Sequence, residues 1–251
     1  MDAGNGAQKA GDILIKTFAK TGRYVFIEPL IPAEISPPKR TSHSLSGAVI
    51  RVAETDITNI GSHSELMLVE HEILLKRRLE DKEYSQNSIV LLDTGHQDKN
   101  QDDYTSAIQT AKDAGLNIVP FNINETAQEA IKALNGNGKN MYYLGILTTL
   151  FQIDSSQLET EIRQTFKKLK PEVLDANITI FKEGIQYANQ TLDIRIDIPE
   201  KDAQKNQILL DGNTAMACGI IDAGIKVFAG YPITPASTIM HNLAQNFAAY
   251  G

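Results

Sequence analysis

"SELMLVEHEILLKRRLEDKEYSQNSIVLLD", residues 64–93, decides the fold of this chain. SELMLVE suits a buried strand, HEILLKRRLEDKE suits a charged helix, and NSIVLLD suits a second strand. A helix around Tyr104 to Ala114 and a strand in GLNIVPFNI, residues 115–123, continue the alternation. Strands that alternate with helices form parallel or mixed sheets covered by helices, so we expect an α/β domain with a three-layer-like arrangement.

The flanking segments extend this pattern in both directions. Residues 1–22 open in a glycine turn and continue as an amphipathic helix, and RYVFIEP (23–29) and GAVIRVAE (47–54) are typical of strands joined by a long polar loop. Residues 125–189 indicate nearly continuous helix, interrupted at NGNGK (135–139), at IDSS and at Pro171. The second half of the domain is therefore predicted to be rich in helix.

A composition change near residue 200 indicates a second domain. TLDIRIDIPEKDAQKNQ, residues 191–207, alternates briefly and then turns polar, which predicts a last strand followed by a linker. We place one domain at 1–199 and the linker with the beginning of another at 200–251. The latter reads as helix, strand (Val227 and Phe228), loop and helix, and it is too short to bury a core of its own. We expect it to be an incomplete α/β domain.

Composition excludes several classes of function. The formal charge of −7, with scattered Lys and Arg, argues against a nucleic-acid surface. No apolar run reaches about 18 residues, so no membrane span is predicted. The single cysteine, Cys218, indicates a reducing, cytoplasmic setting and cannot supply the roughly four thiolates of an iron–sulfur centre. The five histidines lack the spacing of metal ligands, so no metal site is predicted.

Two loops carry residues suited to anionic ligands. In AGNGAQKAG, residues 3–11, Gly4 and Gly6 precede a helix, so the backbone can approach an anion at the helix amino end, or the stretch is a plain tight turn. In PAEISPPKRTSHSLSG, residues 32–47, prolines stiffen a stretch followed by Lys39 and Arg40, two cations suited to phosphate oxygens. A solvated loop is the alternative for this second stretch.

AGYPITPAS, residues 229–237, is the third candidate. Tyr231, Pro232 and Ile233 lead to Thr234, and the prolines on either side hold its hydroxyl in a defined place, as a substrate-orienting donor requires. A helix N-cap at Thr234, with Pro235 at the first helical position, is the competing interpretation.

These motifs together resemble one family, the 2-oxoacid:ferredoxin oxidoreductases, in the form whose α subunit carries a γ domain fused ahead of the α domain. AGNGAQKAG looks like that family's S-G-D-G-x-Q-x-x-G turn, PAEISPPKRT is similar to its P-A-E-I-x-P-P loop, and residues 212–237 look like the opening of its α domain. KNMYYLGIL and EVLDANITIFKEG look like the helical end of its γ domain. Ala3 and Asn5 depart from the family's Ser and Asp.

The resemblance, strongest to the 2-oxoglutarate type, implies an activity. The complete enzyme would oxidatively decarboxylate a 2-oxoacid with CoA, giving acyl-CoA, carbon dioxide and two reduced ferredoxins. Thiamine diphosphate with Mg²⁺ and the iron–sulfur cluster would lie mainly on a partner β subunit, and CoA is a co-substrate. Thr234 would donate to the substrate's carboxylate or keto oxygen, with Tyr231, Pro232 and Ile233 near the thiamine. Lys39 and Arg40 would meet CoA phosphates.

Two other readings stay open. The chain could be a stand-alone γ-like module that binds CoA or a nucleotide, or mediates assembly, without catalysis of its own. An unrelated α/β protein is the third reading, which the order of the motifs disfavours. The abrupt ends of the motif pattern lead us to expect a piece of a longer reading frame.

Overall fold

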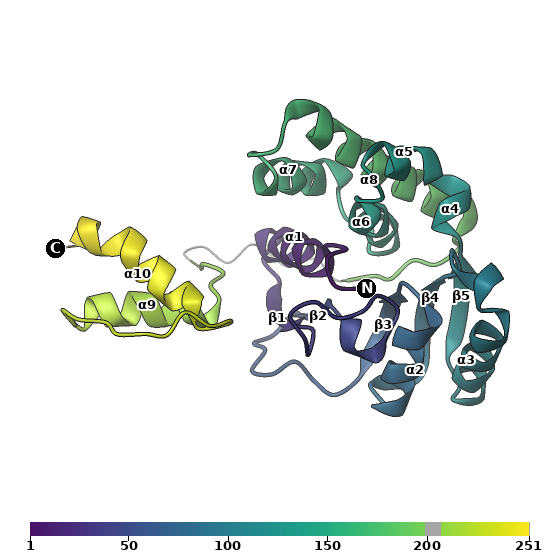
Figure 1. Ribbon diagram of the computed structural model, residues 1–251, viewed down its shortest axis with the longest axis horizontal. Coiled ribbons are helices and arrows are strands. Elements are labelled where there is room, and N and C mark those ends of the chain that lie inside the picture. The colour runs from purple at the N-terminus through teal and green to yellow at the C-terminus, as the bar shows by residue number, and fades with distance from the viewer. Residues whose placement is uncertain (199–206, 251) are drawn as a thin grey trace. The chain divides into compact units, whose positions relative to one another are not determined.

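The computed structural model describes residues 1–198 and 207–250, which belong to two compact units (Figure 1). The first unit holds residues 1–198, and the second holds residues 207–250. The predicted domain boundary between residues 199 and 200 lies outside the described residues. Each unit is therefore described by itself.

Three parallel strands form the centre of the first unit. Their order is β3 (Ser64–Val69), β4 (Tyr84–Asp93) and β5 (Asn117–Phe121), with β4 in the middle. Helix α2 (Glu72–Glu80) connects the first pair and helix α3 (Gln101–Asp113) connects the second. The α/β fold predicted from the sequence is confirmed.

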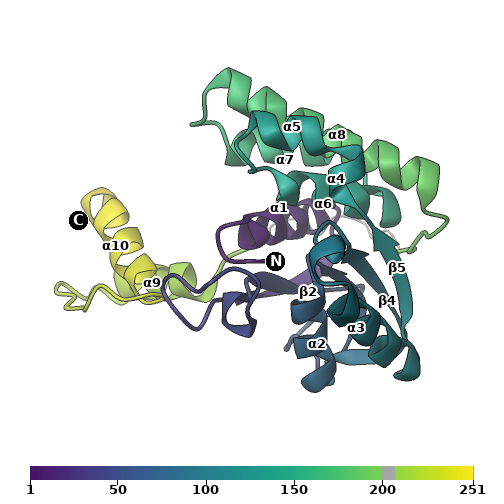
Figure 2. The same ribbon diagram turned by 45° about the vertical axis from the view of Figure 1, so that its right-hand side comes forward.

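The side chains of β4 alternate between two cores. Val90 and Leu92 pack with residues of α2 and α3, whereas Leu91 packs with residues of the helices on the opposite face. Figures 1 and 2 show α2 and α3 on one side of the sheet and α1 and α6 on the other. Because successive side chains of a strand point to opposite faces, this apolar strand joins three layers.

A two-stranded antiparallel ribbon precedes the parallel sheet. It consists of β1 (Tyr24–Leu30) and β2 (Gly47–Ala53), and helix α1 (Ala7–Lys20) packs on it. A Cβ on Gly11 of α1 would lie 2.5 Å from the Cβ of Ala48, so the helix can approach the ribbon closely only with glycine there. A short 3-10 helix, Ser42–Ser44, lies in the loop between the strands, and another, Gln97–Lys99, follows β4.

Five helices complete the first unit, as the sequence predicted for residues 125–189. Two of them decide its shape: α6 has ten of its twelve residues buried, and the 21-residue α8 packs along it. The five are α4 (Ile123–Thr126), α5 (Gln128–Ala133), α6 (Lys139–Leu150), α7 (Ser155–Thr165) and α8 (Pro171–Thr191).

Two predicted strands are absent from the described residues. Residues 192–198 carry no strand, and the amide of Ile196 donates instead to the carbonyl of Leu150, at 2.7 Å. One backbone amide of the segment is therefore satisfied at the carboxyl end of α6. Val227 and Phe228 also form no strand, because the described part of their unit offers no second strand with which to pair.

The second unit consists of α9 (Gly212–Asp222) and α10 (Ser237–Tyr250). Asp211 caps α9 by accepting from the amide of Thr214, and Asn242 donates to the Thr214 hydroxyl at 2.9 Å. Among its described side chains only Ala217 and Leu243 are buried. No helix in the described ranges is both long and apolar enough to cross a membrane.

Two glycines allow α6 and α8 to touch through their backbones. A Cβ on Gly145 would lie 2.2 Å from the carbonyl oxygen of Phe181, and a Cβ on Gly184 would lie 2.1 Å from that of Tyr142. Real Cβ contacts are never so short, so any side chain must push the helices apart.

We predict that Gly145→Ala or Gly184→Ala lowers the free energy of unfolding of the first unit by about 3 kcal/mol, because fixed backbone blocks the new methyl. Urea titration followed by tyrosine fluorescence measures the change. Gly219→Ala on α9, where a Cβ meets nothing within 4 Å, is the control and should leave that transition unchanged. Equal midpoints for all three variants would contradict the close contact.

Candidate functional site

The glycine turn of residues 4–6 starts helix α1. Gly4 and Gly6 have φ of 86° and 79°, and Gly6 is the N-cap residue of the helix. This left-handed conformation favours glycine. A Cβ on Gly6 would also lie 2.5 Å from the side-chain nitrogen of Asn140, so the turn can approach α6 only without a side chain.

Helix α6 starts in the same way. Its N-cap, Gly138, has φ of 93°, and a Cβ there would lie 2.6 Å from the Ile180 side chain. Asn140, in the first turn of α6, is 8% exposed and donates its amide to the carbonyl of Gly6 at 3.2 Å. This hydrogen bond joins the amino ends of α1 and α6.

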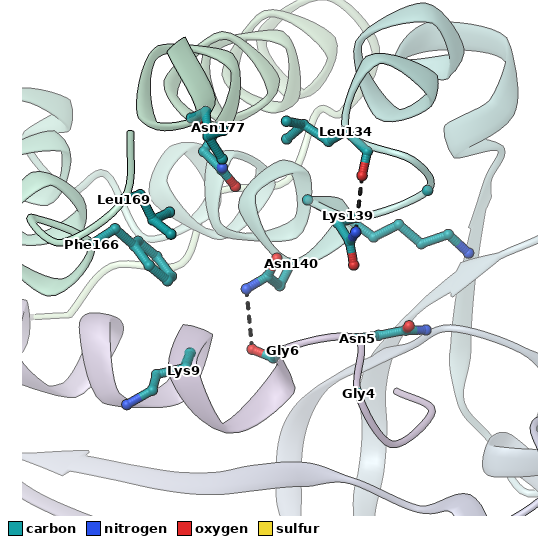
Figure 3. A pocket seen from close by; sticks show the side chains of 14 residues that line it. Gly4, Asn5, Gly6, Lys9, Leu134, Lys139, Asn140, Phe166, Leu169 and Asn177 are labelled. Atoms are coloured by element: carbon teal, nitrogen blue, oxygen red, sulfur yellow. Dashed lines mark hydrogen bonds between the residues drawn. The ribbon is translucent and has the colours of Figure 1, made fainter. Parts of the chain in front are cut away.

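A cavity of about 290 Å³ lies between these two helix starts (Figure 3). One side is polar and includes the two glycine turns and several amide side chains. The apolar part of the lining comes from Leu134, from Phe166 and Leu169 between α7 and α8, and from Val173 at the start of α8. The lining residues are Gly4, Asn5, Gly6, Lys9, Leu134, Gly136, Asn137, Gly138, Lys139, Asn140, Phe166, Leu169, Val173 and Asn177.

The electrostatics of the cavity favour an anion. Each helix amino end carries a partial positive charge and unpaired amides, and here two such ends meet. Lys9 and Lys139 add positive charge, that of Lys139 shared with Glu70 behind the wall, and none of the described residues that line the cavity is acidic. The arrangement can accept phosphate oxygens on its polar side and an uncharged group against Phe166 and Leu169.

A buried polar cluster lies behind the polar side, at the carboxyl end of β3. Glu70 is 1% exposed and accepts from the side chains of Asn5 and Lys139 and from the amide of Asp2. Burial alone would raise the pKa of Glu70, but Lys139 and these hydrogen bonds hold that pKa below its usual value.

Asp2 is the second buried carboxylate of the cluster. Its Oδ1 accepts from the amide of Arg40 at 3.0 Å and from the Ser44 hydroxyl at 2.7 Å, and it lies 2.9 Å from Nε2 of the buried His71. Burial works against the charge of Asp2, but the hydrogen bonds of His71, Ser44 and Arg40 bring its pKa well below the usual range.

A third buried carboxylate, Asp93, ends the central strand. It accepts from the Tyr143 hydroxyl at 2.8 Å and from the amide of Gly95 at 2.9 Å. Burial raises the pKa of Asp93 in spite of these donors. No group of three or more His, Cys, Asp or Glu side chains in the described residues is arranged to hold a metal ion.

Comparison with known proteins assigns the family. Residues 2–187 match the family described as pyruvate ferredoxin/flavodoxin oxidoreductase. The chain belongs to this family. The resemblance to an α subunit of the 2-oxoglutarate type is also supported. The chain is 29% identical over 98% of its length to the 2-oxoglutarate oxidoreductase subunit KorA of Mycobacterium tuberculosis, and it spans 40% of that relative.

Two further relatives agree with this assignment. A segment of 43 residues is 49% identical to the 2-oxoglutarate synthase subunit KorA of Archaeoglobus fulgidus, covering 17% of this chain and 12% of the relative. The fold matches that of the 2-oxoglutarate:ferredoxin oxidoreductase of Magnetococcus marinus, solved with 2-oxoglutarate, coenzyme A and succinyl-CoA, with a TM-score of 0.78 and 23% identity. That match covers 99% of this chain and 40% of the solved one.

The residues singled out in this family member fall into three places. Gly4 and Gly6 line the cavity. Lys39 and Arg40 do not line it: Lys39 is exposed, whereas the guanidinium of Arg40 donates to the buried carboxylate of Glu72 at 2.5 Å. The structure therefore gives Arg40 a partner within the protein.

The remaining candidates belong to the second unit. Tyr231, Pro232, Ile233 and Thr234 are all exposed. Helix α10 begins at Ser237, three residues after Thr234, so Thr234 does not occupy the N-cap position that the competing interpretation gave it.

Of the residues that line the cavity, the sequence predicted only Gly4 and Gly6 as site residues. Gly138, Lys139 and Asn140 come from NGNGK and the residue after it, which was taken only as a turn. The signal was present, because both AGNG and NGNG place Asn-Gly directly before an apolar helix. Lys9 was not among the predicted site residues either.

We predict that Asp2→Asn costs about 2 kcal/mol of stability at pH 7, because three donors face one charged oxygen. A lowered pKa stabilises the fold above the unfolded value of about 3.9 and loses that effect as the pH falls below it. The difference in unfolding free energy between Asp2→Asn and the parent should therefore become smaller below about pH 4.

Urea midpoints of parent and variant at pH 7 and pH 3 measure this effect. Asp12→Asn, where the side chain is 46% exposed, is the control and should change stability by less than about 0.5 kcal/mol at both pH values. A gap for Asp2→Asn that is equally wide at both pH values would contradict a charge effect.

Proposed function

We propose that this chain is part of the α subunit of a 2-oxoacid:ferredoxin oxidoreductase whose substrate is 2-oxoglutarate. The alignment with the Mycobacterium tuberculosis subunit over 98% of this chain carries the proposal. The reaction joins the acyl group of the 2-oxoacid to CoA, releases carbon dioxide and one proton, and passes two electrons to two ferredoxins. The chain spans about 40% of the relatives it matches over its full length.

The cavity between α1 and α6 is the proposed CoA site of this chain. CoA is a polyanion with an uncharged body, and the cavity offers helix-start amides and two lysines on one side and apolar side chains on the other. We assign Gly4 and Gly6 to backbone contacts with phosphate, and Lys9 and Lys139 to its charge. Lys39, exposed on the proline-rich loop, is a further candidate for a CoA phosphate.

Thiamine diphosphate supplies the electron sink in enzymes of this family, which also use CoA and iron–sulfur clusters. The described residues here do not form a site for thiamine diphosphate. Thr234 and Tyr231 are exposed, and the described side chains of their unit enclose only Ala217 and Leu243. Thiamine diphosphate, Mg²⁺ and the iron–sulfur cluster are therefore assigned mainly to a partner β subunit.

The lone exposed Cys218 agrees with that assignment, since a cluster takes about four thiolates. In the assembled enzyme Thr234 is proposed to donate a hydrogen bond to the substrate's carboxylate or keto oxygen. Ferredoxin is the proposed electron acceptor. A cytoplasmic location follows from the same proposal.

A stand-alone CoA-binding module is the second candidate. One observation favours it: the first unit forms the whole cavity. The two candidates differ in whether the assembled protein turns over a 2-oxoacid.

We predict CoA-dependent reduction of a viologen dye when the full-length subunit that contains this chain is combined with its β partner, fastest with 2-oxoglutarate among 2-oxoacids. Thr234→Val should lower kcat/KM at least about 100-fold, the usual loss for one transition-state donor, while Thr234→Ser keeps most of the activity. CoA binding without turnover of any 2-oxoacid would contradict the enzyme function and support the stand-alone binding module.

We predict that Lys9→Ala raises the Kd of CoA about fivefold, because an exposed lysine at the cavity contributes roughly 1 kcal/mol to phosphate binding. Lys16→Ala is the matched control, since Lys16 is exposed on the same helix and does not line the cavity. Calorimetric titration measures both. Equal affinities for the two variants would remove the cavity from CoA binding.

A further inference from the structure

Glu70 contacts both the glycine turn of residues 4–6 and the start of α6 from behind the cavity wall. It directly follows β3, and its oxygens accept from Asn5 Nδ2 at 2.7 and 2.9 Å and from Lys139 Nζ at 3.0 Å. The amide of Asp2 adds a third donor at 2.7 Å. Glu70 does not line the cavity itself.

Both side-chain partners of Glu70 lie in the cavity wall. Asn5 stands between Gly4 and Gly6, the two residues with positive φ that turn the chain into α1. Lys139 is the first residue of α6, and its side chain is 18% exposed. One carboxylate therefore holds the middle of one turn and the first residue of the facing helix.

We propose that Glu70 is a positioning residue of the cavity, which fixes the glycine turn and the start of α6 relative to one another so that their amides face a bound anion. The contacts are charge-assisted and buried, which makes them strong and directional. Glycine turns need such support, since a residue without a side chain leaves the backbone more freedom than any other. For its ligand the inference rests on the proposed CoA function.

Glu70 also limits the positive charge of the site. A lysine at a helix amino end is repelled by the helix dipole, and the buried carboxylate compensates Lys139 there. The Lys139 side chain lines the cavity and remains 18% exposed, so a phosphate can share its charge without breaking the contact with Glu70.

The chain contains a matched control for Glu70. Glu72 is also 1% exposed and ion-paired, but its partner is Arg40, which does not line the cavity. Glu70→Gln and Glu72→Gln therefore each remove one buried charge of similar exposure from neighbouring positions. Only Glu70→Gln removes a charge that lies behind the cavity wall.

Hydrogen exchange of backbone amides, measured on the 251-residue chain without ligand, tests the positioning role directly. Glu70→Gln should speed exchange about tenfold or more in both residues 3–9 and residues 138–142, because both segments lose the same anchor. Glu72→Gln should leave both within about threefold of the parent. Acceleration in only one segment, or equal effects of the two variants, overturns the proposal.

Two single-arm variants, each of which removes one side-chain partner of Glu70, keep the test valid if Glu70→Gln does not fold. Asn5→Ala should speed exchange in residues 3–9 alone, and Lys139→Met in residues 138–142 alone. Glu70→Asp, which keeps the charge, should recover part of the protection in both segments. Unchanged exchange in both single-arm variants overturns the proposal as well.

CoA titration of the same variants distinguishes the positioning role of Glu70 from the proposed CoA function of the chain. Glu70→Gln should raise the Kd of CoA about tenfold while Glu72→Gln changes it less than about twofold. Paired exchange effects together with no CoA binding by the parent chain would retain Glu70 as an anchor and reject the proposed function. Normal CoA binding by Glu70→Gln would reject the positioning role and retain the function.

Discussion

The backbone contact between α6 and α8 is the constraint on which the rest of the first unit depends. Helix α6 is buried on nearly every side, so its position is set by the elements that pack around it. Gly145 and Gly184 allow the two helices to meet without side chains between them. This contact fixes the position of α6. It thereby also fixes the position of Gly138, the N-cap residue of α6, beside the start of α1.

The sequence predicted those parts of the fold that depend on local pattern. The alternation over residues 64–123 predicted the parallel sheet, because a buried strand and its connecting helix each leave a local signature. Residues 192–198 have the alternation of a strand but bond to the end of α6, and Val227 and Phe228 lack a partner strand in the described chain. A strand needs a neighbour, and a neighbour is not a local property.

The site was predictable to the same extent. Gly4 and Gly6, which line the cavity, were singled out because a glycine turn before a helix has a direct physical meaning. Arg40 was assigned to phosphate from its charge, yet it pairs with Glu72, 32 positions away in the sequence. Asn5 was noted only as a departure from the Asp of the family's motif. In the structure its amide donates to the buried Glu70, whereas an aspartate would bring two carboxylates together there.

The second unit sets a different requirement for chemistry. A hydroxyl that orients a substrate must itself be held, and Thr234 is exposed, with no side-chain hydrogen bond among the described residues. The same unit exposes Val227, Tyr231 and Ile233. Such apolar side chains beside a rigid proline loop are suited to contact with another protein surface. If Thr234 acts on the substrate, the contacts that hold it must come from groups beyond the described residues, and a partner surface covering this loop would provide them.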